Sequence, residues 1–486
     1  MFYRDTATGR LPPSSQHALH QLLMTSTSAN LFSSLPLAPA LIANLHQLGY
    51  HQMTPIQAAS LPHVLVQRDL IAQAKTGSGK TAAFGIGILA KLNPAYFAIQ
   101  GLVICPTREL ADQVANELRK LARFLSNVKV LTLCGGTAMR PQIASLEHGA
   151  HIVVGTPGRL LDHIGRGSIK LSTVQTLVLD EADRMVDMGF YEDIVGIVAA
   201  CSPRRQTLLF SATYPDDIRK ASALFLRDPA EVKVESQHAP AQIEQWFYEV
   251  TPETRNGAVA KLLAHYRPTS TLAFCNTKIH CRELADELQQ QGISALALYG
   301  DLEQRERDEI LVLFANQSCS VLVATDVAAR GLDIQNLEAV INVDISKDTE
   351  VHIHRIGRTG RAGEKGLALS LAAANEKKWV RLIEDYQKEP VQWQSLDALA
   401  TTNEVPLQAP MITVCIMGGK KDKLRPGDIL GALTVDVGVE KAQVGKINVF
   451  EFMTYVALDR QLAQEALDRF AQCKIKGRQF KMRIIV

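Results

Sequence analysis

Residues 69–84 read DLIAQAKTGSGKTAAF, and this stretch decides the fold. A short apolar run ends at Ala72, a glycine-rich loop follows, and an apolar stretch of helical character begins after it. A strand, a glycine loop and a helix start in this order are the context of a P-loop, whose backbone N–H groups and positive helix end bind phosphates. The string predicts a nucleotide site in which Lys80 contacts the β- and γ-phosphates and the Thr81 hydroxyl binds Mg²⁺. A glycine-rich turn without a ligand is the alternative, and Ala74 stands where the general pattern has glycine.

An acidic group follows another apolar run. Residues 176–183 read TLVLDEAD, so Asp180 and Glu181 come directly after a candidate buried strand. A carboxylate at the C-terminal end of a parallel strand faces the crevice where ligands bind. Asp180 is therefore a candidate for holding Mg²⁺, and Glu181 for orienting or deprotonating an attacking water. An acidic tetrapeptide alone is usually a solvated loop, so this hypothesis depends on the P-loop upstream.

Three arginines fall within eight residues further along the chain, where residues 354–361 read HRIGRTGR. A basic surface helix or a contact to a phosphate backbone is one interpretation. The sharper hypothesis is that Arg358 and Arg361 act as arginine fingers, which reach the γ-phosphate across a cleft between two domains. Such fingers contribute about 10³–10⁵ in rate in phosphoryl-transfer enzymes.

Short apolar runs that each end in a polar loop recur along most of the chain. Near-continuous runs of this length are typical of strands buried on both faces of a parallel sheet. They lie at 102–104, 152–154, 177–179 and 208–210, and again, after a lapse near 236–241, at 271–274, 321–323 and 340–341. The pattern predicts an α/β fold with two successive parallel-sheet domains.

The predicted boundaries divide the chain into five parts. Residues 1–30, rich in Ser, Thr, Pro and His, are expected to be a disordered leader. The two α/β domains are expected at 31–236 and 243–388, and a proline-containing linker at 389–410. The last part, 411–486, alternates in the order strand, helix, two strands, helix, strand, which predicts a small α+β domain.

Composition excludes several classes of protein. The chain has 486 residues, 47% of them hydrophobic and 21% charged, which rules out a largely disordered, collagen-like or coiled-coil protein. Since no apolar run approaches roughly 18 residues, we expect no membrane span. The eight cysteines include no CxxC pair, which argues against a zinc site or a disulfide framework and predicts a reducing, cytoplasmic compartment. We expect a monomer.

Basic residues concentrate in the last part of the chain. Residues 411–486 hold 13 Lys and Arg and 8 Asp and Glu, a net charge of +5, whereas the rest is slightly acidic. This asymmetry is typical of nucleic-acid binding, since each neutralised phosphate releases counterions. On charge alone, a solvated and solubilising face is an equal alternative.

Together these strings resemble the DEAD-box family of superfamily 2 RNA helicases, over about residues 31–385. The P-loop form that begins with alanine is typical of that family. The resemblance implies two tandem RecA-like domains and an RNA-dependent ATPase that uses ATP and Mg²⁺. It assigns the nucleotide to a set of residues in both domains: Phe32, Thr54, Gln57, Thr76, Gly77, Ser78, Gly79, Lys80, Thr81, Gly331 and Asp333. Phe32 is expected to stack on adenine and Gln57 to hydrogen-bond its edge.

The resemblance also implies roles outside the nucleotide site. Residues that couple the nucleotide state to RNA are expected to be Asp183, Ser211, Thr213 and His354. Residues expected to face the sugar–phosphate backbone, which carries no base information, are Thr107, Arg108, Gly135, Gly136, Thr156, Gly158, Arg159, Thr277, Gln304, Arg307 and Thr325. Closure of the two domains on ATP and RNA is expected to bend one strand and open a short duplex locally.

The order of elements in 411–486 is that of an RNA-recognition module (RRM), which usually stacks bases on aromatic side chains. The first strand has no aromatic residue, and Phe450 and Phe452 are expected to pack in the core rather than to stack on bases. We therefore expect an atypical mode that depends on basic groups and loops. The candidate RNA-binding residues are Lys420, Lys421, Arg425, Lys474, Lys476 and Arg478.

This part also looks like the C-terminal domain of the DbpA-type subfamily. That resemblance implies binding to a hairpin of 23S ribosomal RNA and a role in assembly of the large ribosomal subunit. Two alternatives remain: a general RNA chaperone or RNA-decay helicase whose tail binds RNA loosely, and an ATP-gated RNA clamp with little turnover.

Overall fold

The computed structural model describes residues 30–74, 77–214, 219, 223–234, 243–329, 337–360, 365–400 and 406–485. The chain divides into two compact units between Gln237 and His238, and each is considered by itself. Within the described ranges, no helix has both the length and the apolar character needed to cross a membrane.

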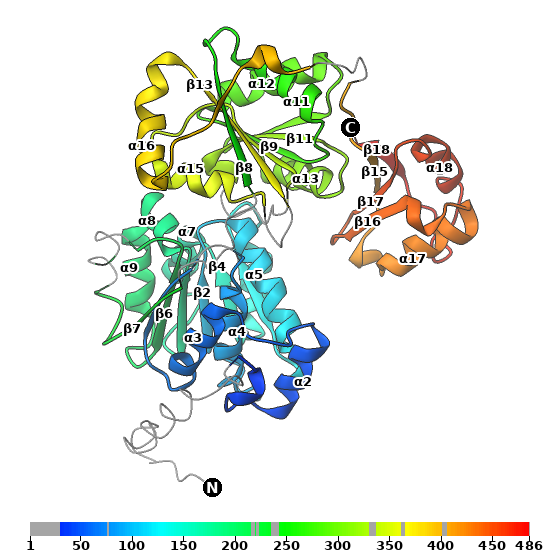
Figure 1. The fold of residues 1–486 in the computed structure, drawn as a ribbon. Coiled ribbons are helices and arrows are strands. Elements are labelled where there is room, and N and C mark those ends of the chain that lie inside the picture. Colours follow the sequence, from blue (N-terminus) through cyan, green and yellow to red (C-terminus); the bar gives the residue numbers. More distant parts are fainter. Residues whose placement is uncertain are drawn as a thin grey trace. The chain divides into compact units, whose positions relative to one another are not determined.

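The first unit contains one parallel sheet of seven strands, the first domain (Figure 1). Its strand order is β3-β4-β2-β5-β6-β1-β7. The strands are β1 (Leu70–Gln73), β2 (Gly101–Ile104), β3 (Val130–Leu133), β4 (Ile152–Gly155), β5 (Thr176–Asp180), β6 (Gln206–Ser211) and β7 (Ala230–Lys233). The central strands β2, β4, β5 and β6 are buried at every residue, as the apolar runs predicted.

Helices cover both faces of this sheet, and each face has its own apolar core. One core includes side chains of α2 (Pro39–Gln47), α3 (Pro55–Leu65), α4 (Lys80–Leu89) and α5 (Arg108–Leu121). The other includes side chains of α7 (Pro157–Gly165), α8 (Ala182–Asp187) and α9 (Tyr191–Ala200), while α6 (Met139–Glu147) buries none of its residues. Proline is the first residue of α2, α3 and α7, where its missing N–H costs nothing.

The second unit begins with another parallel seven-stranded sheet, the second domain, in the order β10-β11-β9-β12-β13-β8-β14. The strands are β8 (Ile243–Glu249), β9 (Thr271–Cys275), β10 (Ala295–Leu298), β11 (Val321–Thr325), β12 (Ala339–Asn342), β13 (Gly366–Ala372) and β14 (Trp393–Gln394). The helices are α11 (Arg255–Tyr266), α12 (Lys278–Gln290), α13 (Gln304–Ala315), α14 (Asp326–Ala329), α15 (Thr349–Ile356) and α16 (Lys377–Gln387).

Part of the segment 389–410, which we expected to be a linker, is built into the second domain. Residues of β14 pair with Phe247 and Tyr248 of β8. Leu399 and Leu407 are buried in the same core as Leu262 and Leu284. Apolar side chains therefore hold much of this segment against the sheet, although its prolines indicated a loop.

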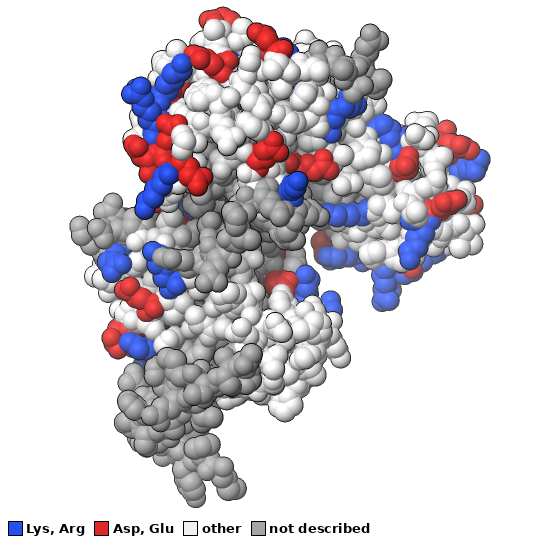
Figure 2. Space-filling view, in the orientation of Figure 1, with Lys and Arg blue, Asp and Glu red and all other residues white. Residues whose placement is uncertain are grey.

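The C-terminal domain has an antiparallel four-stranded sheet in the order β16-β17-β15-β18. Its strands are β15 (Met411–Ile416), β16 (Val444–Val449), β17 (Thr454–Asp459) and β18 (Met482–Ile485). The helix α17 (Pro426–Gly431) continues into a π-helical turn at Ala432–Val437, and α18 (Ala463–Phe470) follows β17. The predicted βαββαβ order is confirmed, and Figure 2 shows Lys and Arg side chains gathered on this domain.

One face of the C-terminal sheet packs against α13 of the second domain. Cys415, Tyr455 and Ile485 form a buried cluster with Val312 and Leu313 of α13. At the end of the helix, Asn316 is 2% exposed. Its amide nitrogen donates to Thr413 Oγ1 at 3.2 Å, and its oxygen accepts from Asn448 Nδ2 at 2.9 Å. The second unit thus contains two domains that share a buried interface.

Candidate nucleotide and RNA sites

The P-loop forms the turn between β1 and α4 that its sequence predicts. Gly77 and Gly79 have φ angles of 80° and 95°, which side chains with a Cβ rarely adopt. A Cβ on Gly79 would also lie 2.5 Å from Gln57 Nε2. Lys80 is the first residue of α4 and only 7% exposed, and its Nζ donates to Ala74 O at 2.9 Å. The ammonium of Lys80 is therefore hydrogen-bonded to a carbonyl of its own loop.

Gln57 connects the predicted adenine motif to this loop. Its Nε2 donates to Gly79 O at 3.1 Å, and its Oε1 accepts from Thr54 N at 2.9 Å. Phe32, predicted to stack on adenine, is 1% exposed and packs in the core of the first domain. Thr76, Gly331 and Asp333 lie outside the described residues, as do Arg361 and residues 1–29 of the expected leader.

Two buried hydroxyls near the P-loop are unsatisfied. Among the described residues, the Oγ of Ser78 and the Oγ1 of Thr54 have no hydrogen-bond partner. Buried hydroxyls without protein partners are rare in native proteins, and bound ligands or water commonly satisfy them. Both belong to the motifs that the sequence assigned to the nucleotide, so the cradle fits a phosphorylated ligand.

The acidic motif lies next to Lys80. Asp180 ends β5 and is 3% exposed, and burial raises the pKa of its carboxyl to about 7 although the Lys80 charge opposes that shift. Glu181 follows with φ 53° and ψ 51°, a left-handed conformation that costs free energy for a residue with a Cβ. The strand therefore ends at Asp180, and Glu181 stands as the N-cap residue of α8.

Asp183 connects the acidic motif to the end of β6. Its Oδ2 accepts hydrogen bonds from Thr213 N and Thr213 Oγ1, both at 3.0 Å. Its own N–H donates to Ser211 Oγ at 3.3 Å. Burial alone raises the pKa of Asp183, but the Thr213 hydrogen bond and the Lys80 charge hold it below its ordinary value. The structure thus brings together three of the four predicted coupling residues.

The predicted RNA-facing residues of the first domain gather at the carboxyl ends of β2, β3 and β4. Thr107 is the N-cap of α5 and accepts from Leu110 N at 3.3 Å. A Cβ on Gly135 would lie 3.1 Å from Arg108 Nη2, so the guanidinium lies over this glycine. Arg159, on α7, donates from Nη1 and Nη2 to Thr137 O at 3.1 Å each. Gly136 shares this loop, and Thr156 and Gly158 lie at the start of α7.

The matching residues of the second domain also follow its strands. Thr277 is the N-cap of α12 directly after β9, and its Oγ1 accepts from His280 N at 3.2 Å. Thr325 ends β11 and accepts from Ala328 N at 3.4 Å. Gln304 begins α13, and Arg307 lies one turn further along the same helix. These ends of β9 and β11 lie side by side, because the two strands pair.

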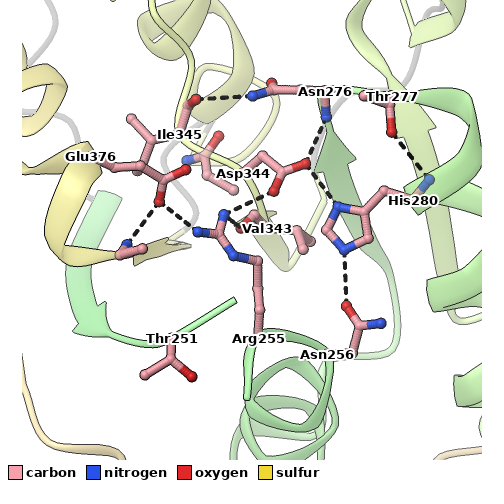
Figure 3. A network of polar contacts seen from close by, with 12 residues as sticks. Thr251, Arg255, Asn256, Asn276, Thr277, His280, Val343, Asp344, Ile345 and Glu376 are labelled. Carbon is pink, nitrogen blue, oxygen red and sulfur yellow. Dashed lines mark hydrogen bonds and ion pairs between the residues drawn. The ribbon is translucent and has the colours of Figure 1, made fainter. Parts of the chain in front are cut away.

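A polar network fixes the loop that carries Thr277 (Figure 3). Asp344 accepts from Asn276 N at 2.8 Å, forms an ion pair with Arg255 at 2.8 Å and is hydrogen-bonded to His280 Nδ1 at 2.9 Å. Arg255 also binds Glu376 at 2.6 Å. Burial alone raises the pKa of the Asp344 carboxyl, but hydrogen bonds from His280 and Asn276 hold it below its ordinary value.

His280 makes a hydrogen bond through each of its ring nitrogens. Nδ1 faces the Asp344 carboxylate, and Nε2 lies 2.9 Å from Asn256 Oδ1. The Asn256 amide is oriented by Glu287, which accepts from its Nδ2 at 2.9 Å. Both ring nitrogens of His280 therefore have hydrogen-bond partners, which fix the orientation of the ring. Cys275, His280 and Asp344 are close enough together for a metal ion, but the Arg255 ion pair accounts for the carboxylate without one.

Arg355, in the arginine-rich motif, has a role that the sequence analysis missed. It is 2% exposed, binds Asp326 with Nε and Nη2 at 2.7 and 2.6 Å, and donates to Asn276 Oδ1 at 3.0 Å. It therefore ties α15 to the ends of β9 and β11. The place of Arg355 within the sequence HRIGRTGR was the feature that could have indicated this role. Arg358 follows α15, which also carries His354, and Thr359 Oγ1 donates to Leu337 O.

The two basic stretches of the C-terminal domain form one surface. Lys476 pairs with Asp428 at 2.8 Å, and Arg478 with Asp422 at 3.7 Å, so the loop at 474–478 lies beside the loop at 420–428. The six predicted RNA-binding residues are all exposed: Lys420, Lys421, Arg425, Lys474, Lys476 and Arg478. Folding thus joins charges that are distant in sequence into one patch.

One expectation for this domain is wrong. Phe450 and Phe452, expected in the core, are 43% and 68% exposed. They lie in the turn between β16 and β17 and not within a strand, so strand alternation does not turn them inward. The inner face of the sheet is filled instead by Val414, Ile416, Val456 and Leu458.

Three protein families match successive parts of the chain. These are DEAD/DEAH box helicase at residues 54–221, helicase conserved C-terminal domain at 254–363 and DbpA RNA binding domain at 413–484. The chain is 51% identical over 455 residues to the ATP-dependent RNA helicase DbpA of Escherichia coli, covering 93% of this chain and 99% of that protein. It is 44% identical to the helicase CshA of Bacillus cereus, over 73% of this chain and 67% of that one.

Solved structures resemble the part of the chain that contains the two parallel sheets. Saccharomyces cerevisiae Dbp5 bound to RNA and ADP BeF3 matches with a TM-score of 0.70 and 29% identity, covering 76% of this chain and 96% of that one. Mss116p bound to ssRNA and AMP-PNP matches with a TM-score of 0.68 and 27% identity, covering 76% and 80%.

Proposed function

The chain belongs to the DEAD-box ATP-dependent RNA helicases of the DbpA type, and from this premise we propose that it opens short duplexes in 23S ribosomal RNA during assembly of the large ribosomal subunit. It is an RNA-dependent ATPase, with ATP as its nucleotide and RNA as its partner. The ribosomal target and the assembly role are the proposed part.

The observation that carries the proposed ATP chemistry is the buried polar cluster around Lys80, whereas the proposed ribosomal target rests on the DbpA RNA binding domain. The Lys80 ammonium, the P-loop N–H groups and two hydroxyls without a partner among the described residues offer donors to a ligand that is both anionic and rich in acceptors. Phosphates of ATP meet both needs. Lys80 would leave Ala74 O for the β- and γ-phosphates, and Glu181 would orient the attacking water.

The oxygen donors of Thr81 and Asp180 fit Mg²⁺, which prefers hydroxyl, carboxylate and water oxygens. When bound, the ion would neutralise charge that develops on the phosphates. Asp180 must be ionised to hold it, and the raised pKa means that its carboxylate forms most readily when a cation is present. Arg358 and Arg361 of the second domain are the proposed guanidinium groups that complete the site.

The RNA-facing residues explain how hydrolysis is coupled to a duplex. Arg108, Arg159 and Thr277 offer guanidinium, hydroxyl and helix N-terminal groups, which bind the backbone of any RNA sequence. The hydrogen bond from Thr213 N to Asp183 joins the acidic motif to the end of β6. We propose that ATP and RNA together close the two domains, and that hydrolysis reopens them and releases the RNA.

Target choice is assigned to the C-terminal domain, because the two sheet domains read only the RNA backbone. Its basic surface supplies long-range attraction to an RNA hairpin. Loose binding by this surface to many RNAs, as in a general RNA chaperone or decay helicase, is the alternative.

The experiment measures phosphate release by the full-length protein with a 23S hairpin fragment and with a scrambled RNA of the same length. A chimera in which residues 411–486 are replaced by an unrelated basic domain is the control. We expect strong stimulation by the 23S fragment only in the native chain. Equal stimulation by the two RNAs would contradict the ribosomal target, and absence of steady turnover with any RNA would favour an ATP-gated clamp.

A further inference from the structure

The turn between β16 and β17 exposes two phenylalanines, Phe450 and Phe452. The turn is closed by a hydrogen bond from Phe450 N to Met453 O at 2.8 Å. The Phe450 ring meets Tyr455 edge-on, with centroids 5.6 Å apart at an interplanar angle of 85°. Tyr455 itself is only 5% exposed, so the ring of Phe450 packs against a buried side chain and remains 43% exposed to solvent. Neighbouring exposed aromatic side chains often mark a binding site.

A lysine-containing loop is attached to this turn. Lys420 N donates to Phe450 O at 2.8 Å, and Lys421 N donates to Glu451 O at 3.0 Å. Gly419 permits this approach, because a Cβ there would collide with Phe450 O and Glu451 O. The backbone bonds therefore hold the Lys420–Lys421 segment beside the turn, and the exposed Lys421 ammonium lies 4.0 Å from the exposed carboxylate of Glu451.

The rest of the face that includes Tyr455 is not open for stacking. An RRM usually stacks bases on aromatic side chains of its outer sheet face. Here Tyr455, Cys415 and Ile485 on that face are buried against Val312 and Leu313 of α13. The aromatic rings that remain exposed next to this face are those of the β16–β17 turn.

We propose that this turn is a base-stacking site: an unpaired nucleotide of the RNA stacks on Phe450 or Phe452, and Lys420 and Lys421 bind its flanking phosphates. Every base has a face that stacks on phenyl rings, and lysines beside them match the charge of a nucleic acid rather than that of an acidic or neutral apolar surface. The inference rests on the proposed function and adds to it a preference for RNA with unpaired nucleotides, such as a hairpin loop.

The test uses the full-length protein without ATP and two RNA probes. One probe is a blunt duplex, and the other is the same duplex with a short single-stranded extension that contains 2-aminopurine. We expect at least one of Phe450→Ala and Phe452→Ala to weaken binding of the extended probe by about tenfold and to abolish quenching of 2-aminopurine. Binding of the blunt duplex should not change, and Phe452→Tyr should retain both signals.

Val435→Ala is the matched control, since Val435 is 81% exposed on the same domain and lies in the helical turn at 432–437. It should behave as the native chain does. Lys420→Gln and Lys421→Gln should reduce the salt dependence of binding by about one ion each. Unchanged affinity and quenching in both phenylalanine variants would overturn the proposal, and would leave an apolar protein surface as the occupant of the turn.

Failure of the ribosomal target can be distinguished from failure of this site. Suppose that the extended probe is bound through Phe450 or Phe452, with equal affinity for 23S and scrambled extensions. That result would support the stacking site and contradict the proposed target. If 23S fragments stimulate hydrolysis selectively in Phe450→Ala and Phe452→Ala, the target stands and the stacking site falls.

Discussion

A single lysine organises the charges of the nucleotide site. Lys80 is buried, and its ammonium donates to a P-loop carbonyl. Its positive charge also acts to lower the pKa of Asp180 and of Asp183. A buried charge is tolerated only when it is paired and hydrogen-bonded. Asp180 and Asp183 differ because Asp183 receives hydrogen bonds from Thr213, whereas burial dominates at Asp180. Asp180 is the proposed metal ligand, and Asp183 is the proposed coupling residue.

Glu181→Gln should separate hydrolysis from binding. The amide keeps the size of the side chain but cannot accept a proton, so we expect phosphate release to fall by about 10²-fold or more. ATP-dependent RNA binding should persist, because Lys80 and the RNA-facing residues are unchanged, whereas Lys80→Ala should lose both. Glu192→Gln, at an exposed acid of α9, is the control in a coupled phosphate-release assay. Native turnover in Glu181→Gln would contradict the assigned role.

His352 is a buried histidine without hydrogen-bond partners among the described residues. Burial lowers its pKa to about 3, and the charge of Arg355 adds to that effect. The unfolded chain binds a proton near pH 6.5 and the folded one does not, so stability is lost as the pH falls below about 6.5, by at most about 1.4 kcal/mol per pH unit.

His352→Phe should remove this acid sensitivity and stabilise the second domain, because the ring would pack beside Phe247 without a desolvated nitrogen. All three tryptophans, Trp246, Trp379 and Trp393, lie in this domain, so their fluorescence reports its urea unfolding selectively. His265→Gln, at an exposed position, is the control. If the midpoint of His352→Phe fell between pH 7 and pH 5 as steeply as that of the native chain, His352 would not be the cause.

At the scale of elements, the strands and the motifs at their ends were predictable, and contacts between distant elements were not. Apolar runs predicted β2, β4, β5 and β6 because both faces of a central parallel strand are buried. The site residues at their carboxyl ends follow from the same geometry. The exposure of Phe452 depends on turn geometry, and the burial of Leu407 on a distant core. Neither leaves a periodic pattern in the local sequence.

The interface between α13 and the C-terminal sheet is another contact that could not be predicted from the sequence, because Leu313 and Cys415 meet only in the folded chain. Leu313→Glu should separate the two domains by placing a charge in this cluster. Cys415 is 1% exposed, and burial raises the pKa of its thiol, so it should react slowly with a thiol reagent in the native chain. We expect faster labelling of Cys415 in the variant, measured by mass spectrometry.

Cys275, in the core of the second domain, should remain unlabelled and so report that this domain stays folded. Ile279→Glu places the same charge at an exposed position of α12 and is the matched control. Labelling of Cys415 at an unchanged rate in Leu313→Glu would show that the helix does not protect this face.

At the scale of the molecule, the predicted functional groups are distributed over three domains, each built on its own sheet. The first domain holds the P-loop and the acidic motif, and the second holds the arginine motif and the Arg255 and Arg355 networks, which fix the loops predicted to face RNA. The C-terminal domain adds a basic surface. We propose that ATP and RNA together join the first two domains through Arg358 and Arg361.

The most direct test is single-molecule energy transfer between dyes on cysteines introduced at Glu192 and Glu253, exposed positions of the first and second domains, in a background without the native cysteines. We predict one distribution for the free protein and a new, distinct one only when ATP and RNA are both present. Arg358→Ala combined with Arg361→Ala should largely abolish that new state. A distribution that stays the same with both ligands, or that changes equally in the double variant, would contradict the account.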